Sequence, residues 1–313
     1  MIESLGNTTE DPVIAIMGPT ASGKTALSIE VAKELNGEII SVDSALIYRG
    51  MDIGTAKPCE KEKEGIPHWL IDTHDPSESY SVSAFFDDTL RLVKDIQHRG
   101  KTPILVGGTM MYFNALVKGI APLPKGDLDI KSAIEDEASK KGWIAMHEYL
   151  TTIDPECSNR IHPNDPQRIT RAIEVYRISG KSLSWWQDQT PKTAPFKLHE
   201  FAIAPENRSD LHERIAKRFH IMLEQGLVPE VEKLFARPDL NRNMAAIRSV
   251  GYRQVWEYLE GSLNESEMAE RGIIATRQLA KRQMTWLRGW SSLTWLDTFD
   301  DARLAKLLAK IAR

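Results

Sequence analysis

The chain has 313 residues, enough for one large or two ordinary domains, and its 42% hydrophobic and 27% charged content is typical of a soluble globular protein. A net charge of −4 argues against a generally basic surface, so any face that binds nucleic acid has to be local. Only Cys59 and Cys157 occur, without CxxC spacing or a neighbouring histidine cluster, which argues against a disulfide framework or a zinc site.

The first residues, MIESLGNTTED, lack the basic segment and apolar core of a signal peptide. No run along the chain approaches eighteen apolar residues, the length that a membrane-spanning helix needs. We therefore expect a cytoplasmic protein that does not enter a membrane.

The stretch GPTASGKT, residues 18–25, fits the phosphate-binding pattern G-x-x-x-x-G-K-[ST]. Its context fits as well, because the apolar run Val13–Met17 predicts a buried strand before it and residues 26–35 predict a helix after it. Loop amides, the lysine and a Mg²⁺ ion at Thr25 would hold the phosphates. The motif leaves open whether the ligand is ATP, GTP or another pyrophosphate, and a plain glycine-rich turn is the structural alternative.

Short apolar runs alternate with helical stretches along the chain, at residues 13–17, 38–42, 68–71, 103–106 and 201–204. This alternation predicts an α/β fold with a P-loop NTPase-like parallel sheet and helices on both faces. Ligands of such sheets bind beyond the carboxyl ends of the strands. Those ends carry Gly18, Asp43, Asp72 and Gly107, which we expect along one edge.

The second strand leads into SVDSALIYRGMDIGTAKP, where Asp43 can act as metal ligand, general base or substrate anchor, or can merely cap a turn with Ser44. Polar residues among glycines indicate a substrate loop. The fourth strand leads into GGTMMYF, where paired glycines allow close approach to the backbone and Thr109 offers a hydroxyl; a tight turn is the alternative. Asp72 is either a spare carboxylate near a metal or a solvated strand end.

Residues 120–195 are polar and helical in pattern, and they separate the fourth strand from the fifth. We interpret them as an inserted all-helical lobe, with residues 1–119 and 196–313 forming one discontinuous catalytic core. Within the lobe, Asp165 or Asn164 can cap a helix that Pro166 begins and Gly180 ends.

Two later stretches carry basic residues on helical faces. Arg214 and Arg218 stand four apart on one edge, which suits a pyrophosphate, although a solvated face paired with nearby acids is the alternative. Residues 273–290 contain no acidic residue and place Arg277, Lys281 and Arg288 on one face, with Leu279, Trp286 and Trp290 predicted as the anchored face. This pattern favours phosphodiester contacts, and an ordinary surface helix remains the alternative.

A set of stretches in this order makes the chain resemble the tRNA dimethylallyltransferase family, also called tRNA isopentenyltransferases. The stretches are GPTASGKT, DSALIYRGMDIGTAKP, GGTMMYFNAL, DPQRITRAIEVYRISGKS, RIAKRFHIMLEQG, IRSVGYRQVWEYLEG and TRQLAKRQMTWLRGW. The resemblance covers almost the whole chain, with conservative variations at Met110, Met111 and Ser249. It is closest to the shorter bacterial form, without the zinc finger of longer eukaryotic members.

The resemblance implies transfer of the dimethylallyl group from dimethylallyl diphosphate to N6 of adenosine 37 in tRNA, next to the anticodon. It implies catalytic roles for Asp43 as general base and for Lys24, Thr20, Arg214 and Arg218 at the departing diphosphate. The diphosphate would bind Gly18, Pro19, Thr20, Ala21, Ser22, Gly23, Lys24 and Thr25, with Mg²⁺ at Thr25.

Contacts with the tRNA anticodon stem-loop are implied on both sides of an everted adenine. They involve Asp43, Ser44, Ala45, Leu46, Thr109, Gln167, Arg168, Ile169, Thr170, Arg171, Arg248, Gly251, Arg253, Arg277, Lys281, Arg282 and Arg288. We expect a monomer that needs no partner protein. The alternatives are a P-loop kinase for a nucleotide or small molecule, which would bind ATP, a prenyltransferase of free adenine nucleotides, and a nucleotide-controlled RNA-binding switch.

Overall fold

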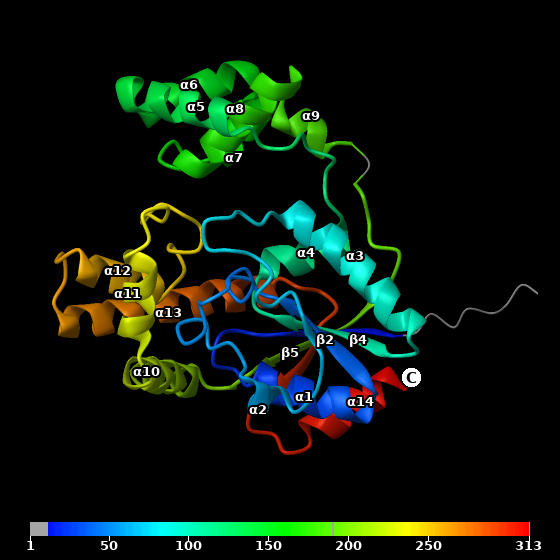
Figure 1. Ribbon diagram of the computed structural model, residues 1–313. Coiled ribbons are helices and arrows are strands. Elements are labelled where there is room, and N and C mark those ends of the chain that lie inside the picture. Colours follow the sequence, from blue (N-terminus) through cyan, green and yellow to red (C-terminus); the bar gives the residue numbers. More distant parts are fainter. Residues whose placement is uncertain (1–11, 190, 313) are drawn as a thin grey trace, which may run out of the picture. The chain divides into compact units, whose positions relative to one another are not determined.

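The computed structural model describes residues 12–189 and 191–312, so the amino-terminal stretch considered for a signal peptide lies outside the described residues. The chain forms two compact units (Figure 1). Met1–Val117 and Pro195–Arg313 make up one, which we call the core unit, and Lys118–Ala194 make up the other, which we call the helical unit.

A six-stranded sheet forms the centre of the core unit, and every neighbouring pair of strands is parallel. The strand order is β3-β2-β4-β1-β5-β6. The strands are β1 (Val13–Met17), β2 (Gly37–Val42), β3 (His68–Trp69), β4 (Thr102–Gly107), β5 (Leu198–Ala204) and β6 (Thr294–Asp297). The predicted fold class is confirmed, and the sequence analysis missed β6, which has only four residues.

Helices cover the sheet on both faces, so that β1 and β2 are buried along their whole length. One face carries α1 (Lys24–Glu34) and α14 (Arg303–Ile311), and the other carries α3 (Val82–His98), as Figure 1 shows. The connections also contain α2 (Glu60–Lys63) and α4 (Met110–Lys118). The continuous apolar run of β1 matches this burial on two sides, whereas β2 also buries the polar residues Glu38 and Ser41.

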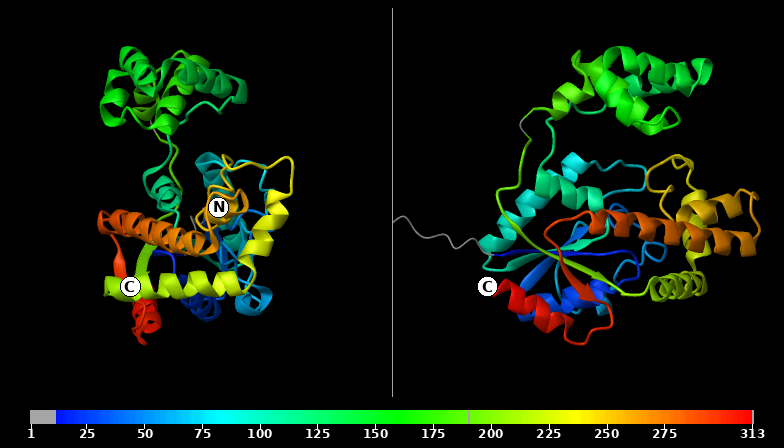
Figure 2. Two further views of the ribbon diagram at one scale, coloured as in Figure 1. Left: turned by 90° about the vertical axis from the view of Figure 1, so that its left-hand side faces the viewer. Right: turned by 180° about the vertical axis from the view of Figure 1, so that it is seen from behind.

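Four further helices of the core unit pack together around a second apolar cluster, which includes Phe219, Leu227, Tyr252 and Met268. They are α10 (Arg208–Glu224), α11 (Leu227–Phe235), α12 (Tyr252–Leu259) and α13 (Glu265–Arg288). Helix α10 lies against α13 (Figure 2). Gly272 allows this close contact, because an added Cβ would lie 2.0 Å from the Phe219 ring.

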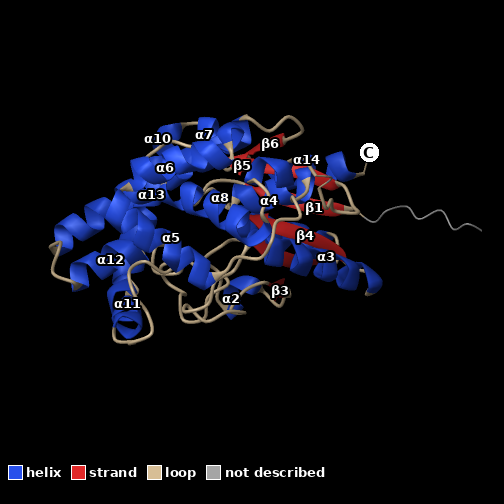
Figure 3. Ribbon diagram, turned by 90° about the horizontal axis from the view of Figure 1, so that it is seen from above, coloured by secondary structure: helices blue, strands red, loops and turns tan. Residues whose placement is uncertain are grey.

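The helical unit contains helices and one isolated β-bridge within the described residues (Figure 3). Its helices are α5 (Leu128–Lys141), α6 (Trp143–Ile153), α7 (Pro155–Arg160), α8 (Pro166–Ser179) and α9 (Leu183–Gln187). The Asp165 side chain caps α8 by accepting from the Arg168 N–H, and Gly180 ends it with a φ of 67°. The punctuation predicted for this helix is therefore present. In the described parts of the chain, no helix is long and apolar enough to cross a membrane.

Candidate active site

A cavity of about 190 Å³ opens at the carboxyl ends of β1, β2 and β4. It belongs entirely to the core unit. The phosphate loop, the stretch after β2 and the turn after β4 supply one part of its wall, and α10 and α13 supply another. The functional part of the lining consists of Thr20, Lys24, Thr25, Asp43, Gly107, Gly108, Arg218, Gly251 and Gln283. The predicted meeting of strand ends at one edge therefore occurs for β1, β2 and β4.

The phosphate loop presents an open helix N-terminus to this cavity. Helix α1 begins at Lys24, and its N-cap is Gly23 with a φ of 93° and no capping side chain. The first turn of α1 also lacks an acidic residue. The N–H groups of a first helical turn have no partner within the helix and carry a partial positive charge. The loop therefore offers amide donors of the kind that bind phosphate.

Side chains from the loop itself and from distant parts of the core unit hold the loop's backbone in place. The Lys24 ammonium donates to the carbonyls of Gly18 (3.0 Å) and Pro19 (2.7 Å). Arg214 Nε donates to the Ala21 carbonyl at 2.7 Å, and the Thr298 hydroxyl donates to the carbonyl of Ser22 at 2.8 Å. Thr298 follows β6, so the missed strand delivers one of these braces.

Lys24 is the most perturbed cation of the site. Burial is the main cause that lowers its pKa from 10.5 to about 7, and the positive charge of Arg218 lowers it further. The carboxylate of Asp43 acts in the opposite direction. A negatively charged ligand beside Lys24 would therefore raise its pKa and favour the ammonium form.

The two arginines predicted at the pyrophosphate have different positions. Arg218 lines the cavity, where burial lowers its pKa and Asp43 raises it. Arg214 donates to the phosphate loop and places its guanidinium carbon 5.6 Å from the Phe299 ring centre, and it does not line the cavity. The structure thus assigns Arg214 a supporting place behind the loop. Of the loop side chains, Thr20 lines the cavity, whereas Ser22 is fully buried.

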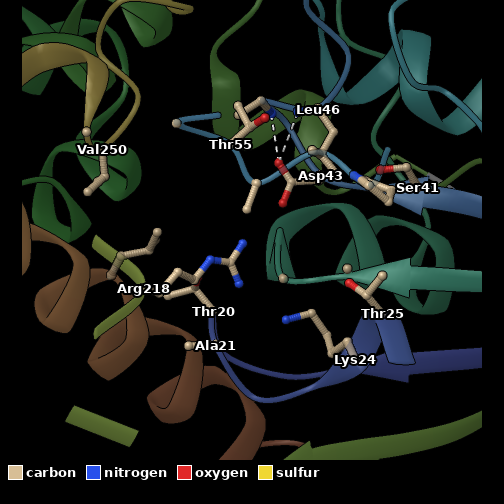
Figure 4. A pocket seen from close by; sticks show the side chains of 18 of the residues that line it. Thr20, Ala21, Lys24, Thr25, Ser41, Asp43, Leu46, Thr55, Arg218 and Val250 are labelled. Carbon is tan, nitrogen blue, oxygen red and sulfur yellow. Dashed lines mark hydrogen bonds between the residues drawn. The ribbon is translucent and has the colours of Figure 1, made fainter. Parts of the chain in front are cut away.

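Asp43 lies at the end of β2, opposite the two cations. Figure 4 shows the side chains of Asp43, Lys24 and Arg218 pointing into the same cavity. The Oδ1 atom of Asp43 accepts from the N–H groups of Ala45 (2.8 Å) and Leu46 (3.4 Å). Among the described residues, none donates to Oδ2. The turn-capping interpretation and a chemical role are therefore compatible, because Oδ1 caps the turn and Oδ2 is left for the chemistry.

The turn after β4 is shaped by contacts within the protein. A Cβ on Gly107 would lie 2.0 Å from the Val42 carbonyl oxygen, and one on Gly108 would lie 2.3 Å from Gln283 Nε2. The glycines thus admit the protein's own groups and also line the cavity. Thr109 accepts from the Ser44 N–H at 3.1 Å and does not line the cavity, so it steadies the residue after Asp43.

The segment from Ser44 to Lys57 is fixed mainly by acidic residues. Glu230 accepts from the N–H groups of residues 52, 53 and 54 at 2.8 to 3.1 Å and from the Tyr252 hydroxyl. Lys57, which is buried, pairs with Asp52 and with Asp72. Asp72 is therefore engaged in an ion pair and does not line the cavity, contrary to the spare-carboxylate alternative.

The basic helix differs from the predicted orientation on its buried side. Ala280, Gln283 and Leu287 are buried, whereas Trp286 is 45% exposed, so the predicted anchor at Trp286 is wrong. Small residues let α13 approach its neighbours, and this matters more than the size of an apolar side chain. Lys281, Arg282 and Arg288 are exposed, and Arg277 is half-buried.

Residues of the stretch RSVGYR line two different cavities. Gly251, with Ser249 and Val250, lines the main cavity. Arg248 and Arg253 line a second, polar cavity of about 160 Å³, where Arg253 Nε donates to Glu257 at 3.0 Å. Both arginines are exposed, as phosphate contacts require.

In the helical unit, the stretch QRITR lies at the start of α8. Gln167 and Arg168 are exposed, and Arg171 is half-buried and pairs with Glu174. Ile169 is 0% exposed and Thr170 only 5%. The side chains of these two residues therefore belong to the interior of the unit.

The metal-binding potential of the cavity is limited to few protein groups. Among the residues that the structure describes, no three His, Cys, Asp or Glu side chains gather into a metal site. Of the described residues that line the cavity, Asp43 is the one carboxylate, and Thr25 presents a hydroxyl at the start of α1. Mg²⁺ often takes one or two protein ligands and completes its shell with water and substrate phosphates. These donors fit a magnesium ion bound together with a diphosphate.

Sequence reasoning missed Gln283, which lines the cavity and joins two of its walls. It also missed Thr298 and Glu230. No local pattern distinguishes these residues, because their partners lie far away in the sequence.

Three solved structures are similar to this chain. The tRNA isopentenylpyrophosphate transferase of Bacillus halodurans is 36% identical over 97% of each chain, with a TM-score of 0.71. The tRNA delta(2)-isopentenylpyrophosphate transferase of Staphylococcus epidermidis is 36% identical over 96% of this chain and 99% of that one, with a TM-score of 0.69. A eukaryotic dimethylallyltransferase acting on tRNA is 29% identical over 96% of this chain and 77% of that one, with a TM-score of 0.78.

A family model described as IPP transferase matches residues 46–290, well over half of the chain. This match begins after the phosphate loop and Asp43, and the structural matches extend over these residues as well. The chain belongs to the IPP transferase family.

Proposed function

We propose that this protein transfers the dimethylallyl group of dimethylallyl diphosphate to N6 of the adenosine at tRNA position 37 and releases diphosphate. Family membership and the similarity to enzymes named for tRNA prenylation support the reaction. The observation that carries the proposal is the shared cavity, where a phosphate loop with two cations faces a carboxylate. A prenyl transfer to an amine requires both a place for departing diphosphate and an acceptor for the amine's proton.

The loop end of the cavity suits the diphosphate. The open N-terminus of α1, Lys24 and Arg218 supply positive charge on one side of the ligand. As the bond between C1 of the prenyl group and the ester oxygen of the diphosphate breaks, negative charge grows on that oxygen. These donors stabilise the charge. Thr20 would contribute its hydroxyl, and Arg214 would act through the loop that it supports.

Asp43 suits the proton transfer. The exocyclic amine of adenine is a weak nucleophile, because its lone pair is delocalised into the ring. As N6 forms its bond to C1, its proton would move to Oδ2 of Asp43, the carboxylate oxygen without a donor among the described residues. The backbone donors on Oδ1 fix the orientation of the carboxylate during this step.

Mg²⁺ is part of the proposal. Thr25 would hold it beside the diphosphate, consistent with the small number of protein donors in the cavity. When bound, the ion would neutralise charge on the diphosphate.

The RNA contacts are proposed from exposure and charge. In the core unit, Lys281, Arg282, Arg288, Arg248 and Arg253 are exposed cations that can meet backbone phosphates of the anticodon stem-loop. In the helical unit, Gln167 and Arg168 are available at the start of α8. The adenine has to leave its stack to reach a cavity of this kind. The enzyme would act as a cytoplasmic monomer.

A transfer assay tests the proposal. The protein is incubated with radiolabelled dimethylallyl diphosphate, Mg²⁺ and, as acceptor, either an unmodified tRNA transcript or free adenosine monophosphate, with and without ATP. We expect label in the RNA without ATP, and none in a transcript with guanosine at position 37. Label in free adenosine monophosphate instead of tRNA, or an absolute need for ATP, would contradict the proposal.

A further inference from the structure

The side chain of Gln283 forms hydrogen bonds to two walls of the cavity. Among the described residues, no other side chain is hydrogen-bonded to both the phosphate loop and the turn after β4. Its Oε1 accepts from the N–H of Thr20 in the phosphate loop at 3.0 Å. Its Nε2 donates to the carbonyl of Gly108, in the turn after β4, at 2.9 Å. The side chain is buried, since the residue is only 8% exposed, and it lines the cavity.

The two bridged segments follow neighbouring strands. β1 pairs with β4, with Met17 opposite Gly107, and the phosphate loop and the glycine turn leave the sheet directly after these residues. The chain continues from β1 to β2 on one side of β1 and later reaches β5 on the other. Such a switch point is where parallel sheets open a crevice for ligands. Gln283 therefore joins the two segments at the point where the crevice is built.

The packing of α13 and the contact with Gly108 restrict the movement of the Gln283 side chain. Helix α13, which carries Gln283, packs on α10 through the contact of Gly272 with Phe219. A Cβ on Gly108 would lie 2.3 Å from Gln283 Nε2, so the turn is shaped around this amide group. Both hydrogen bonds are to backbone groups, which can move only if the loop or the turn moves.

We propose that Gln283 is a positioning residue that holds the phosphate loop and the Gly107–Gly108 turn at the separation required for prenyl transfer. This inference rests on the proposed function. Because the Thr20 N–H already donates to Gln283, a bound phosphate would accept from the N–H groups nearer the start of α1. Small displacements of reacting groups can reduce rates by about a hundredfold.

The test compares Gln283→Ala with Gln278→Ala, in which an exposed glutamine of the same helix is changed. For Gln283→Ala we expect kcat/KM for dimethylallyl diphosphate to fall by about 10- to 100-fold, with tRNA affinity within about twofold of wild type. Gln278→Ala should resemble wild type in both. Thermal melts establish that each variant is folded. Gln283→Met, which keeps the volume without the hydrogen bonds, replaces the alanine variant if that one does not fold.

A double-mutant cycle with Gly108→Ala separates the bridge from a general structural effect. The added methyl group of Gly108→Ala displaces the Gln283 amide, so this variant alone should lose activity as Gln283→Ala does. In the Gln283→Ala background it should then cost less than about threefold more, because the bridge is already absent. Multiplicative losses would overturn the inference, and so would a Gln283→Ala enzyme that equals the Gln278→Ala control. Failure of the wild-type protein to prenylate tRNA would instead refute the proposed function.

Discussion

The lowered pKa of Lys24 predicts that diphosphate binding takes up a proton. With a pKa of about 7, only about one tenth of the empty sites carry a charged lysine at pH 8. A bound diphosphate favours the ammonium form, because opposite charge at short range stabilises it. On binding at pH 8, Lys24 should therefore take up most of one proton per site.

Calorimetry of inorganic diphosphate binding in two buffers that differ in ionisation enthalpy measures this uptake. Relative to Lys24→Arg, the wild-type affinity should fall by up to about tenfold for each pH unit between pH 7.5 and 9, equivalent to about 1.4 kcal/mol. Lys24→Arg is the matched control, since a guanidinium keeps its charge over this range. If the wild type and Lys24→Arg take up the same number of protons, Lys24 is charged in the empty site and the reasoning is refuted.

The same shift affects stability, and its direction follows from proton binding. Between pH 7 and 10.5 the unfolded chain holds a proton on Lys24 that the folded protein has lost, so the free energy of unfolding contributed by this residue rises with pH. Below pH 7 the charged lysine costs the folded state at most about 5 kcal/mol. Lys24→Met should flatten this rise, as urea denaturation at pH 6 and pH 9 can measure.

Three further changes have distinct expected outcomes. Asp43→Asn should reduce prenyl transfer by about 10²- to 10⁴-fold with tRNA binding in gel-shift assays nearly unchanged, and near-normal turnover would exclude Asp43 as the base. Reversal of Lys281 and Arg288 to glutamate should weaken tRNA binding and lower its salt dependence while diphosphate affinity stays constant; a loss of diphosphate affinity alone would assign this face to the phosphate site. Glu230→Ala leaves three N–H groups and the Tyr252 hydroxyl without their acceptor, so the free energy of unfolding should fall by about 3 kcal/mol in urea denaturation, and an unchanged value would argue against the clamp.

The parts of the site that the sequence predicts are those encoded by local patterns. The phosphate loop follows a strand and opens a helix, so eight consecutive residues contain its geometry. Asp43 and Gly107 end parallel strands, and parallel strands bring their carboxyl ends to one edge. Contacts between residues far apart in the chain have no such signature. Gln283 and Thr298 are more than 260 residues from their loop partners.

The buried face of α13 shows where residue type misleads. Large apolar side chains suggested burial at Trp286, yet the helix buries Gly272, Ala280 and Gln283 together with Met268 and Leu287. Close packing of α13 on α10 requires a small residue at Gly272. The polar Gln283 is buried because both of its amide atoms find backbone partners. A glutamine in a run of basic residues looks solvent-exposed in sequence, and only its distant partners decide otherwise.

The bracing of the phosphate loop implies that the loop is formed before the donor arrives. Arg214 and Thr298 hold carbonyl groups on its outer side, and Gln283 holds the Thr20 N–H, none of which involves a substrate. Lys24 also belongs to this frame, because its ammonium group donates to two loop carbonyls and keeps its third N–H for a phosphate oxygen. Binding energy would therefore be used mainly to favour the charged form of one lysine, while the ordering of the loop costs little. A preorganised loop is what a reaction requires when its main demand is to stabilise departing charge.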